Sequence, residues 1–205
     1  EKVQYSSPRY STFLMVKYGK ESGNYQISGS NEDEVKIENR TLLNGRFINP
    51  NDILNKLPVA VIGRMVQRDL IKNGDPIGKE IEINGTMFKV IGVFSDEGGD
   101  WDERMISVPI STLQQMKKSS DTVNTVFIAY NENLDPKKAI EYSDKLEKQI
   151  KARKKISPDD ESGVVVRNNA KNLEDTFAFL AVLTGIVGFI GMGTLLAGII
   201  GISNI

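Results

Sequence analysis

Five acidic side chains crowd one short segment, and they are the residues of this chain that come nearest to a catalytic or metal-binding pattern. They are Asp96, Glu97, Asp100, Asp102 and Glu103. Carboxylate oxygens are the ligands that hard cations such as Ca²⁺ prefer, but the spacing of an EF-hand loop is absent. A solvent-exposed loop is therefore the favoured interpretation. Trp101 lies in the same segment. Because exposed aromatic residues often anchor interfaces, we predict that it contacts a partner.

Two glycines and a lysine between residues 74 and 80 have the outline of a phosphate-binding loop. The segment is Gly74-Asp75-Pro76-Ile77-Gly78-Lys79-Glu80. A phosphate loop needs one more residue before the lysine, a Ser or Thr directly after it, and a helix that follows. This segment is one residue too short before Lys79 and has Glu80 in place of the Ser or Thr. We also expect no helix after it. We predict a turn that leads into a strand, so the chain carries no ATPase motif.

The composition removes most of the chemistry that proteins perform near neutral pH. The 205 residues include no His and no Cys, which excludes Ser-His-Asp and Cys-His catalysis and zinc sites built from His or Cys. The 26 basic and 27 acidic residues leave a net charge of -1, so no overall field attracts nucleic acid. We predict no catalytic, cofactor-binding or metal-binding residue and no nucleic-acid partner.

Short apolar runs between turn signals predict a mixed α and β globular part up to about residue 170. The expected strands are 11–18, 35–37, 58–63, 79–83, 86–93 and 105–109. Asn84-Gly85 predicts a tight hairpin turn before the strand at 86–93. The polar, Gly-containing stretch 19–29 is expected to end the first strand, and 42–47 to form a turn. Short helices are expected at 53–56, 64–71 and 111–116.

A β-α-β unit is predicted after this block. The apolar run 123–130 predicts a strand, and Asp135 as N-cap with Pro136 at the first helical position predicts a helix to about Lys155. Acidic and basic residues four positions apart support this helix, and a basic run at its C-terminus suits the helix dipole. Val164-Val165-Val166 predicts the returning strand.

The C-terminal end of the chain is apolar. No charged side chain occurs from Phe177 to Ile205, and about 20 apolar residues are enough to cross the hydrocarbon core of a membrane. A buried helix of a soluble core is the less favoured alternative, because so short a chain has little to surround it. Small residues at four-residue spacing let a second helix approach closely. We therefore predict helix-packing positions at Gly185, Gly188, Gly193, Ala197 and Gly201.

Six short motifs between Leu43 and Thr112 resemble, in order and spacing, the extracytoplasmic domain of MacB-type ABC transporter permeases. The motifs are Asn44-Gly45-Arg46-Phe47, Val59-Ala60-Val61-Ile62-Gly63, Asp75-Pro76-Ile77-Gly78-Lys79, Ile81-Glu82-Ile83-Asn84-Gly85, Phe88-Lys89-Val90-Ile91-Gly92-Val93 and Val108-Pro109-Ile110-Ser111-Thr112. Residues 198–205 are similar to the segment where the family's second transmembrane helix runs into a cytoplasmic coupling region. The resemblance covers nearly the whole chain and is least distinctive over the first 40 residues.

The resemblance implies an α+β fold with two subdomains and one transmembrane α-helix. Residues 35–120 are expected to form a β-rich, Sabre-like subdomain, and residues 121–172 a β-α-β, Porter-like subdomain. Residues 1–34 are expected to be an N-terminal strand region that packs with the Porter-like subdomain. Residues 173–205 are expected to be the transmembrane helix.

The resemblance also implies a function, in which the chain transmits ATP-driven motion for export of a substrate such as a peptide, antibiotic or lipoprotein. ATP and Mg²⁺ would bind to a fused or separate ABC ATPase and not to this chain. The other implied partners are a second permease subunit, in a homo- or heterodimer, and a periplasmic adaptor with a TolC-like outer-membrane channel. The implied location is the bacterial inner membrane, with the globular part in the periplasm or outside the cell.

Two alternatives stay open from the sequence. One is an FtsX-like signalling permease whose domain regulates an envelope hydrolase. The other is a membrane-anchored enzyme that uses the carboxylates of residues 96–103, which the missing His and Cys make the least favoured. The substrate has no signature in the sequence, because no pocket residues are identifiable.

Overall fold

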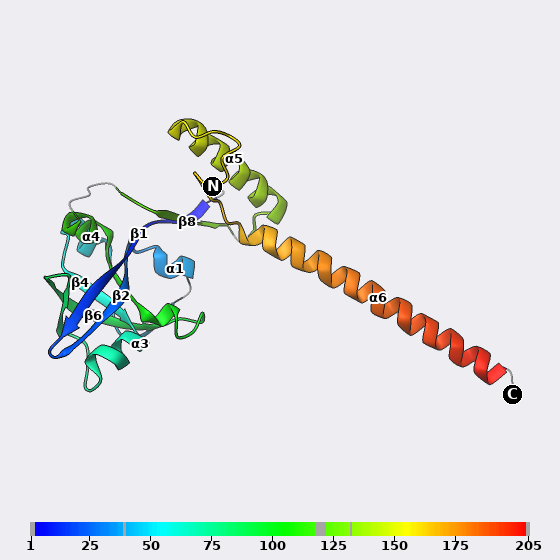
Figure 1. Cartoon of the computed structure of the whole chain (residues 1–205), viewed down its shortest axis with the longest axis horizontal. Coiled ribbons are helices and arrows are strands. Elements are labelled where there is room, and N and C mark those ends of the chain that lie inside the picture. Colours follow the sequence, from blue (N-terminus) through cyan, green and yellow to red (C-terminus); the bar gives the residue numbers. More distant parts are fainter. Residues whose placement is uncertain (1–2, 39, 118–121, 132, 204–205) are drawn as a thin grey trace. The chain divides into compact units, whose positions relative to one another are not determined.

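The computed structural model describes residues 3–38, 40–117, 122–131 and 133–203 of the chain. The chain divides into two compact units, Glu1–Asn131 and Glu132–Ile205. Every strand of the described residues belongs to the first unit, and the second unit consists of two long helices and their connection. The protein therefore has the mixed helix and strand fold with a sheet-rich core that the sequence predicts (Figure 1).

Six strands of the first unit pair in a closed ring. They are β1 (Val3–Tyr18), β2 (Glu21–Ser30), β4 (Val59–Gly63), β5 (Glu80–Ile83), β6 (Thr86–Ser95) and β7 (Met105–Pro109). The order around the ring is β1-β2-β7-β4-β6-β5, and β5 pairs with β1 again. The β2–β7 and β4–β6 pairs are parallel and the others are antiparallel. Closure gives each of these strands a neighbour on both sides, which protects sheet edges.

The interior of the ring is the main hydrophobic core. Ile81 and Ile83 of β5 and Phe88 and Val90 of β6 are fully buried, because alternate residues of a strand point to one side. Helices close the core with further apolar side chains. They are α3 (Arg64–Val66), its π-helical continuation η1 (Gln67–Ile71) and α4 (Ile110–Met116), which contribute Val66, Leu70 and Leu113. Burial of side chains of this size stabilises a fold by about 1.5–3 kcal/mol each.

The β5–β6 hairpin confirms the clearest turn prediction. Asn84 and Gly85 have φ angles of 47° and 85°, the left-handed conformation that a two-residue turn of this kind needs. Ile83 and Thr86 face each other directly across the turn. The strands expected at 58–63 and 105–109 and the helices expected at 64–71 and 111–116 are also present.

Three local predictions are wrong. Residues 35–37 belong to the helix α1 (Glu34–Glu38) and not to a strand, because the carboxylate of Glu34 is drawn into buried ion pairs. Most of the stretch 19–29 is β2, whose small residues let α4 approach: a Cβ at Gly29 would lie 3.0 Å from Leu113 Cδ2. The turn expected at 42–47 contains β3 (Thr41–Gly45), which pairs with β6 outside the ring.

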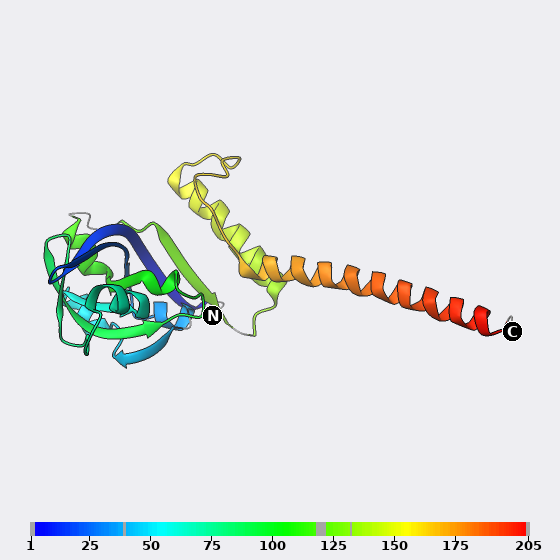
Figure 2. The same cartoon turned by 60° about the horizontal axis from the view of Figure 1, so that its bottom comes forward.

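β1 is longer than the predicted strand and serves two partners. Its residues Tyr10–Tyr18 pair with β2 in the ring, whereas Val3–Arg9 pair with β8 (Thr125–Tyr130) outside it. Figures 1 and 2 both show β8 alongside this N-terminal half of β1, and we call the pair the β1–β8 ribbon. Asn124 extends the pairing with its side-chain amide, which accepts from Ser11 N–H at 3.1 Å and donates to Ser11 O at 2.9 Å.

The second unit contains α5 (Pro136–Lys154) and α6 (Asn169–Ser203). The predicted start of α5 is confirmed, because Asp135 Oδ1 accepts from Lys137 N–H at 2.8 Å and Pro136 is the first helical residue. The strand predicted at Val164-Val165-Val166 is wrong, since these residues form no strand. A strand needs a neighbouring strand, and the described residues of this unit contain none. The segment instead runs into Asn168, whose Nδ2 donates to Ser143 Oγ on α5 at 2.8 Å.

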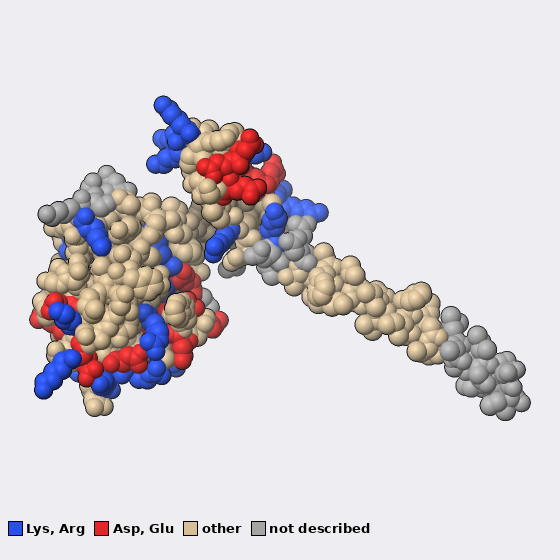
Figure 3. Space-filling model, in the orientation of Figure 1, with Lys and Arg blue, Asp and Glu red and all other residues tan. Residues whose placement is uncertain are grey.

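One helix of the described residues is long and apolar enough to cross a membrane, by length and composition. This span is Thr176–Leu195 of α6. Its large apolar side chains, among them Phe179, Val182 and Phe189, are exposed, and Figure 3 shows no charged residue along this stretch. A helix that is apolar on all sides needs an apolar surrounding, which agrees with the predicted transmembrane segment.

Candidate functional site

The segment 96–103, which we call the acidic loop, does not gather its five carboxylates into one site. Glu103 is fully buried and accepts from Arg64 Nε at 2.8 Å and from Asp96 N–H at 3.2 Å. The Asp96 carboxylate accepts from Arg40 Nε at 3.3 Å and from Gly98 N–H at 2.9 Å. Two of the five acids therefore brace the loop. In the part of the chain that the structure describes, no group of three His, Cys, Asp or Glu side chains could hold a metal ion.

The acidic loop rests on the end of β4. A Cβ at Gly63 would lie 2.0 Å from Glu103 O, so only glycine fits there. Trp101 directly precedes the short 3-10 helix η2 (Asp102–Arg104), and it is 75% exposed. The loop thus presents Trp101 to solvent from a braced support, and its contact with a partner stays a prediction.

The segment from Gly74 to Glu80 is a turn, as predicted. Asp75 Oδ1 accepts from Ile77 N–H at 3.0 Å and from Asn44 Nδ2 at 3.1 Å. The N–H of Gly78, which a phosphate loop would direct at its ligand, donates to Val90 O at 2.8 Å. With this donor engaged inside the fold, the segment offers no cradle of free backbone donors for a phosphate.

Two glycines of the motifs bring β3 and β6 into backbone contact. A Cβ at Gly45 would lie 2.2 Å from Ile91 O, and one at Gly92 would lie 2.3 Å from Arg46 O. Gly45 also has a φ of 79°, which disfavours any side chain. Close packing of the backbone therefore explains these motif residues, and no chemistry is needed to account for them.

Arg46 and Asp52 fasten the segment that follows β3. Arg46 donates to both carboxylate oxygens of Asp52, at 2.6 and 3.0 Å, and Asn49 and Asp52 cap α2 (Pro50–Leu54) reciprocally. Burial acts to raise the pKa of the Asp52 carboxyl, but the hydrogen bonds from Arg46 and from Asn49 N–H outweigh it and hold the pKa below the ordinary 3.8. The hydrogen bond to Asp52 raises the pKa of Arg46.

A set of buried and half-buried charges lies where the β1–β8 ribbon meets the ring, and we call it the ionic joint. It consists of Arg9, Glu34, Glu38, Arg40 and Asp96. The acids of α1 hold both arginines: Glu34 pairs with Arg9 and with Arg40, and Glu38 does the same. The side chains of Glu34 and Arg40 are each only 2% exposed. A hydrogen bond from Ser30 Oγ of β2 further satisfies Glu34.

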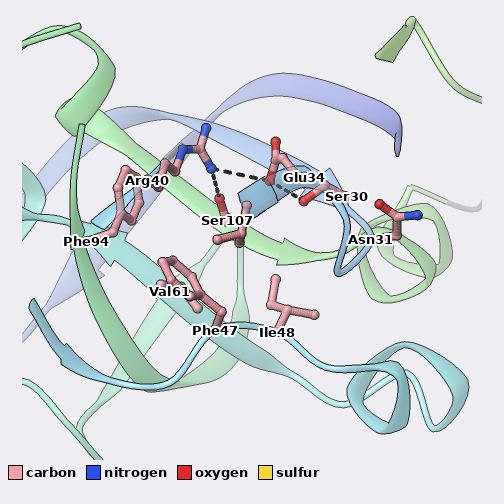
Figure 4. A pocket seen from close by; sticks show the side chains of 10 residues that line it. Ser30, Asn31, Glu34, Arg40, Phe47, Ile48, Val61, Phe94 and Ser107 are labelled. Carbon is pink, nitrogen blue, oxygen red and sulfur yellow. Dashed lines mark hydrogen bonds and ion pairs between the residues drawn. The ribbon is translucent and has the colours of Figure 1, made fainter. Parts of the chain in front are cut away.

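Arg40 pairs with all three acids of the ionic joint, and Figure 4 shows its contacts with Glu34 and Ser107. Its NH1 donates to Glu34 Oε2 at 3.3 Å and to Ser107 Oγ of β7 at 3.0 Å, and its Nε donates to Asp96 Oδ2 at 3.3 Å. The guanidinium also lies 4.7 Å from the centroid of the Phe94 ring, a favourable cation–π contact. Arg40 therefore ties α1 to β6 and β7 of the ring.

The space beside the ionic joint is too small for an organic ligand. The cavity measures about 10 Å³ and is lined by Ser30, Glu34, Arg40 and Phe47, among others. That is room for about one water molecule, whereas small-molecule sites enclose roughly 300–1,000 Å³. In the second unit a groove of about 430 Å³ runs beside α5, but its buried cation Lys151 is already bound by Glu147 at 2.7 Å. The ionic joint is thus a junction between elements and not a pocket.

Sequence reasoning missed the ionic joint. Two of its pairs join residues far apart in the chain: Arg9 and Glu34 are separated by 25 positions, and Arg40 and Asp96 by 56. No local spacing connects such residues. The one available signal was the charge of Glu34, Glu38 and Arg40, which flank the strand expected at 35–37, since charges rarely suit a buried position without a partner.

The predicted helix-packing positions lie in α6. A Cβ at Gly185, Gly188 or Gly193 would meet nothing within 4 Å, so each leaves open space on the helix surface. Ala197 and Gly201 fall in the same helix, but their surroundings lie outside the described residues. The packing of these positions against another helix therefore stays a prediction.

Comparison with known proteins identifies relatives of the whole globular part. The sequence model of the MacB-like periplasmic core domain matches residues 1–146. The macrolide export ATP-binding/permease protein MacB of Bdellovibrio bacteriovorus is 27% identical over 201 residues, which cover 91% of this chain and 30% of that protein. The pyoverdine export ATP-binding/permease protein PvdT of Pseudomonas aeruginosa is 34% identical over 102 residues, 48% of this chain and 15% of that protein. The chain thus spans less than a third of the length of these relatives.

The fold itself is also found among solved structures. The periplasmic region of MacB from Actinobacillus actinomycetemcomitans superposes with a TM-score of 0.71, covering 86% of this chain and 77% of that one. The sequence identity is only 19%, so this likeness concerns the fold alone. The mixed architecture with its sheet-rich core is therefore one that has been observed in a MacB periplasmic region.

Proposed function

Because the chain belongs to the MacB-like periplasmic core domain family of ABC transporter permeases, we propose that it is the extracytoplasmic domain and transmembrane stem of an exporter. In this role it transmits ATP-driven motion from the membrane to the periplasm and so drives export of a substrate. The match of the family model over residues 1–146 carries the proposal. The relatives named for macrolide and pyoverdine export support the direction of transport.

The architecture supports a mechanical role. A closed ring with a close-packed core moves as one body, since interiors of this density deform little. The span Thr176–Leu195 supplies a helix that could connect such a body to the membrane. The described residues offer buried ion pairs and braced loops where an enzyme would need convergent free groups.

The finer division that we propose follows the family. Residues 35–120 form the Sabre-like subdomain, residues 121–172 with β8 and α5 form the Porter-like subdomain, and residues 173–205 form the transmembrane helix. Residues 1–34 contribute β1, which pairs both with β2 in the ring and with β8 in the ribbon. We propose that the open positions Gly185, Gly188 and Gly193 receive another helix of the permease.

The proposed partners lie outside this chain. An ABC ATPase domain or subunit binds ATP and Mg²⁺, and a second permease subunit completes a homo- or heterodimer in the bacterial inner membrane. A periplasmic adaptor and a TolC-like channel would carry the substrate, such as a peptide, antibiotic or lipoprotein, across the outer membrane. An FtsX-like signalling role is not favoured, because the relatives are named for export.

The test uses the full-length transporter reconstituted in lipid with its ATPase. Lys20, which is exposed at the β1–β2 turn, is replaced by Cys and spin-labelled, and the distance between the labels of the two permease subunits is measured. We expect the distance to differ between the nucleotide-free state and the ATP-bound state of a hydrolysis-deficient ATPase. A matched ATPase variant that cannot bind ATP should show no change. Export at the normal rate with one fixed distance throughout the cycle would contradict the proposal.

A further inference from the structure

One strand of the β1–β8 ribbon, β8, lies on the covalent route between the ring and the helix α6. β8 ends at Tyr130, the first unit ends at Asn131, and the chain then continues into the unit that contains α6. At its other end the ribbon joins the ring within β1 itself, where Arg9 is the last residue paired with β8 and Tyr10 the first paired with β2. A pull on α6 therefore reaches β8 through the chain, and from β8 it reaches β1 up to Arg9 through the hydrogen bonds of the ribbon. The chain itself continues from β8 back to α4.

Arg9 holds the ribbon to α1 at this position. Its guanidinium pairs with Glu34 and with Glu38, the latter at 2.5 Å, and it lies 4.2 Å from the centroid of the Phe127 ring of β8. A second contact is exposed: Lys36 of α1 lies over the ring of Tyr5, 4.6 Å from its centroid. The side chain of Arg9 is 11% exposed, whereas that of Lys36 is 52% exposed.

The contact between the ribbon and the ring differs in kind from the interior of the ring. Ion pairs, a cation–π contact and a hydrogen bond from Asn31 Nδ2 to Ser6 O at 3.1 Å hold it. Polar groups also line it: Arg9 Nε and the hydroxyls of Ser7 and Ser11 are buried without a hydrogen-bond partner among the described residues. Water can replace ion pairs and hydrogen bonds when such a contact opens, and it would also satisfy these three groups. Water offers no such replacement for a buried Phe88 or Ile83. The ionic joint is therefore the place where this unit can open while the ring stays intact.

We propose that Arg9 is a latch that sets the direction of the β1–β8 ribbon relative to the ring. In the closed arrangement, which the structure shows, Arg9 pairs with Glu34 and Glu38. In the open arrangement Arg9 leaves both acids, the ribbon bends at residues 9–11, and Arg40 keeps Glu34 and Asp96 attached to the ring. Tension along β8 favours the open arrangement. This latch rests on the proposed function, because it describes how motion of the membrane helix reaches the ring.

The experiment measures the ribbon in the chain alone, solubilised in detergent and without an ATPase. The chain has no Cys, so Gln4→Cys on the ribbon and Lys89→Cys on the ring, both at exposed positions, give one clean pair of spin labels. The Arg9→Met variant should broaden the distribution of distances between these labels roughly twofold, because a minor open state becomes populated. Glu38→Gln, which weakens the same contact at its more exposed side, should broaden it less.

Two controls separate a latch from general support of the fold. Lys36→Met removes the exposed contact of α1 with Tyr5 and should leave the distribution unchanged. A reference pair within the ring, Lys20→Cys with Lys89→Cys, should keep its width in all variants. An unchanged ribbon distribution in Arg9→Met would overturn the latch. The latch would also be overturned if, in Arg9→Met and Glu38→Gln, the distances of the reference pair broadened as much as those of the ribbon pair. Arg9 would then support the ring itself. Since no ATP is involved, either failure would leave the transport test of the proposed function standing.

Discussion

The ring and the ionic joint are neighbours in one compact unit, yet opposite forces hold them. The ring closes around buried apolar side chains, and backbone contacts at Gly63 of β4 and Gly92 of β6 leave no room for even a methyl group. The ionic joint buries Glu34 and Arg40, half-buries Arg9, Glu38 and Asp96, and leaves Arg9 Nε without a partner among the described residues. Apolar burial stabilises a single arrangement, whereas a buried ion pair adds little net stability. A protein that moves as a rigid body needs the first kind of packing inside the body and the second kind where it bends.

The largest expected effect tests the ring. Phe88→Ala deletes a fully buried aromatic side chain and should lower the free energy of unfolding by about 3–5 kcal/mol. Phe13→Ala is the matched control, because Phe13 is 59% exposed on β1 and its loss should cost less than about 1 kcal/mol. Denaturant unfolding in detergent, followed by circular dichroism of the strands, measures both. Equal effects of the two substitutions would remove the distinction between interior and surface on which the comparison rests.

The next effect tests the ionic joint through a double-mutant cycle. Glu34→Gln and Arg40→Met should each destabilise the protein, and their combination should cost less than the sum, because each single variant takes one ion-pair partner from a buried charge. The coupling energy is expected to be about 1–3 kcal/mol. Additive effects would mean that the two residues act independently, in spite of the 3.3 Å between their charged atoms.

The ion pair of Arg46 and Asp52 is only partly buried, since Arg46 is 47% exposed and Asp52 is buried. Asp52→Asn should cost about 1–2 kcal/mol at pH 7. Because the pKa of Asp52 is lower in the folded than in the unfolded protein, its contribution is present above the unfolded value of about 3.9 and is lost as pH falls through the folded value. The difference between wild type and Asp52→Asn should therefore shrink below about pH 4 in unfolding curves. A difference that stays constant down to pH 2.5 would contradict the lowered pKa.

The smallest expected effect comes from an exposed ion pair on the surface of the ring, which is compared with the buried pair of the ionic joint. Lys17 and Glu82 are 3.7 Å apart on β1 and β5, with side chains 54% and 38% exposed. A double-mutant cycle with Lys17→Met and Glu82→Gln should give a coupling energy below about 0.5 kcal/mol, because water screens the pair. A coupling as large as that of Glu34 with Arg40 would show that burial is not what distinguishes the ionic joint.

Local patterns in the chain were enough to predict much of the ring. The apolar run of β4, the alternation of β5 and the Asn84-Gly85 turn are complete within a few residues, and the N-cap Asp135 of α5 is equally local. The missed elements depend on distant partners. β2 is rich in Ser and Gly, and it is a strand because β1 and β7 pair with it on both sides. Val164-Val165-Val166 shows the reverse, since apolar residues form no strand where the described unit offers no neighbouring strand.

The functional interpretation divides in the same way. Residue types alone determined that His and Cys chemistry is absent and that the run from Phe177 onward is apolar enough for a membrane. The resemblance of the motifs between Leu43 and Thr112 indicated the permease family, which the family model matches. Only the tertiary structure decided that the acids at 96–103 brace a loop, and that Arg9, Glu34 and Arg40 meet at the start of the ribbon. The physical reason is range. Hydrophobic periodicity and turn conformation act between residues a few positions apart, whereas an ion pair forms wherever folding brings two charges together, at any separation along the chain.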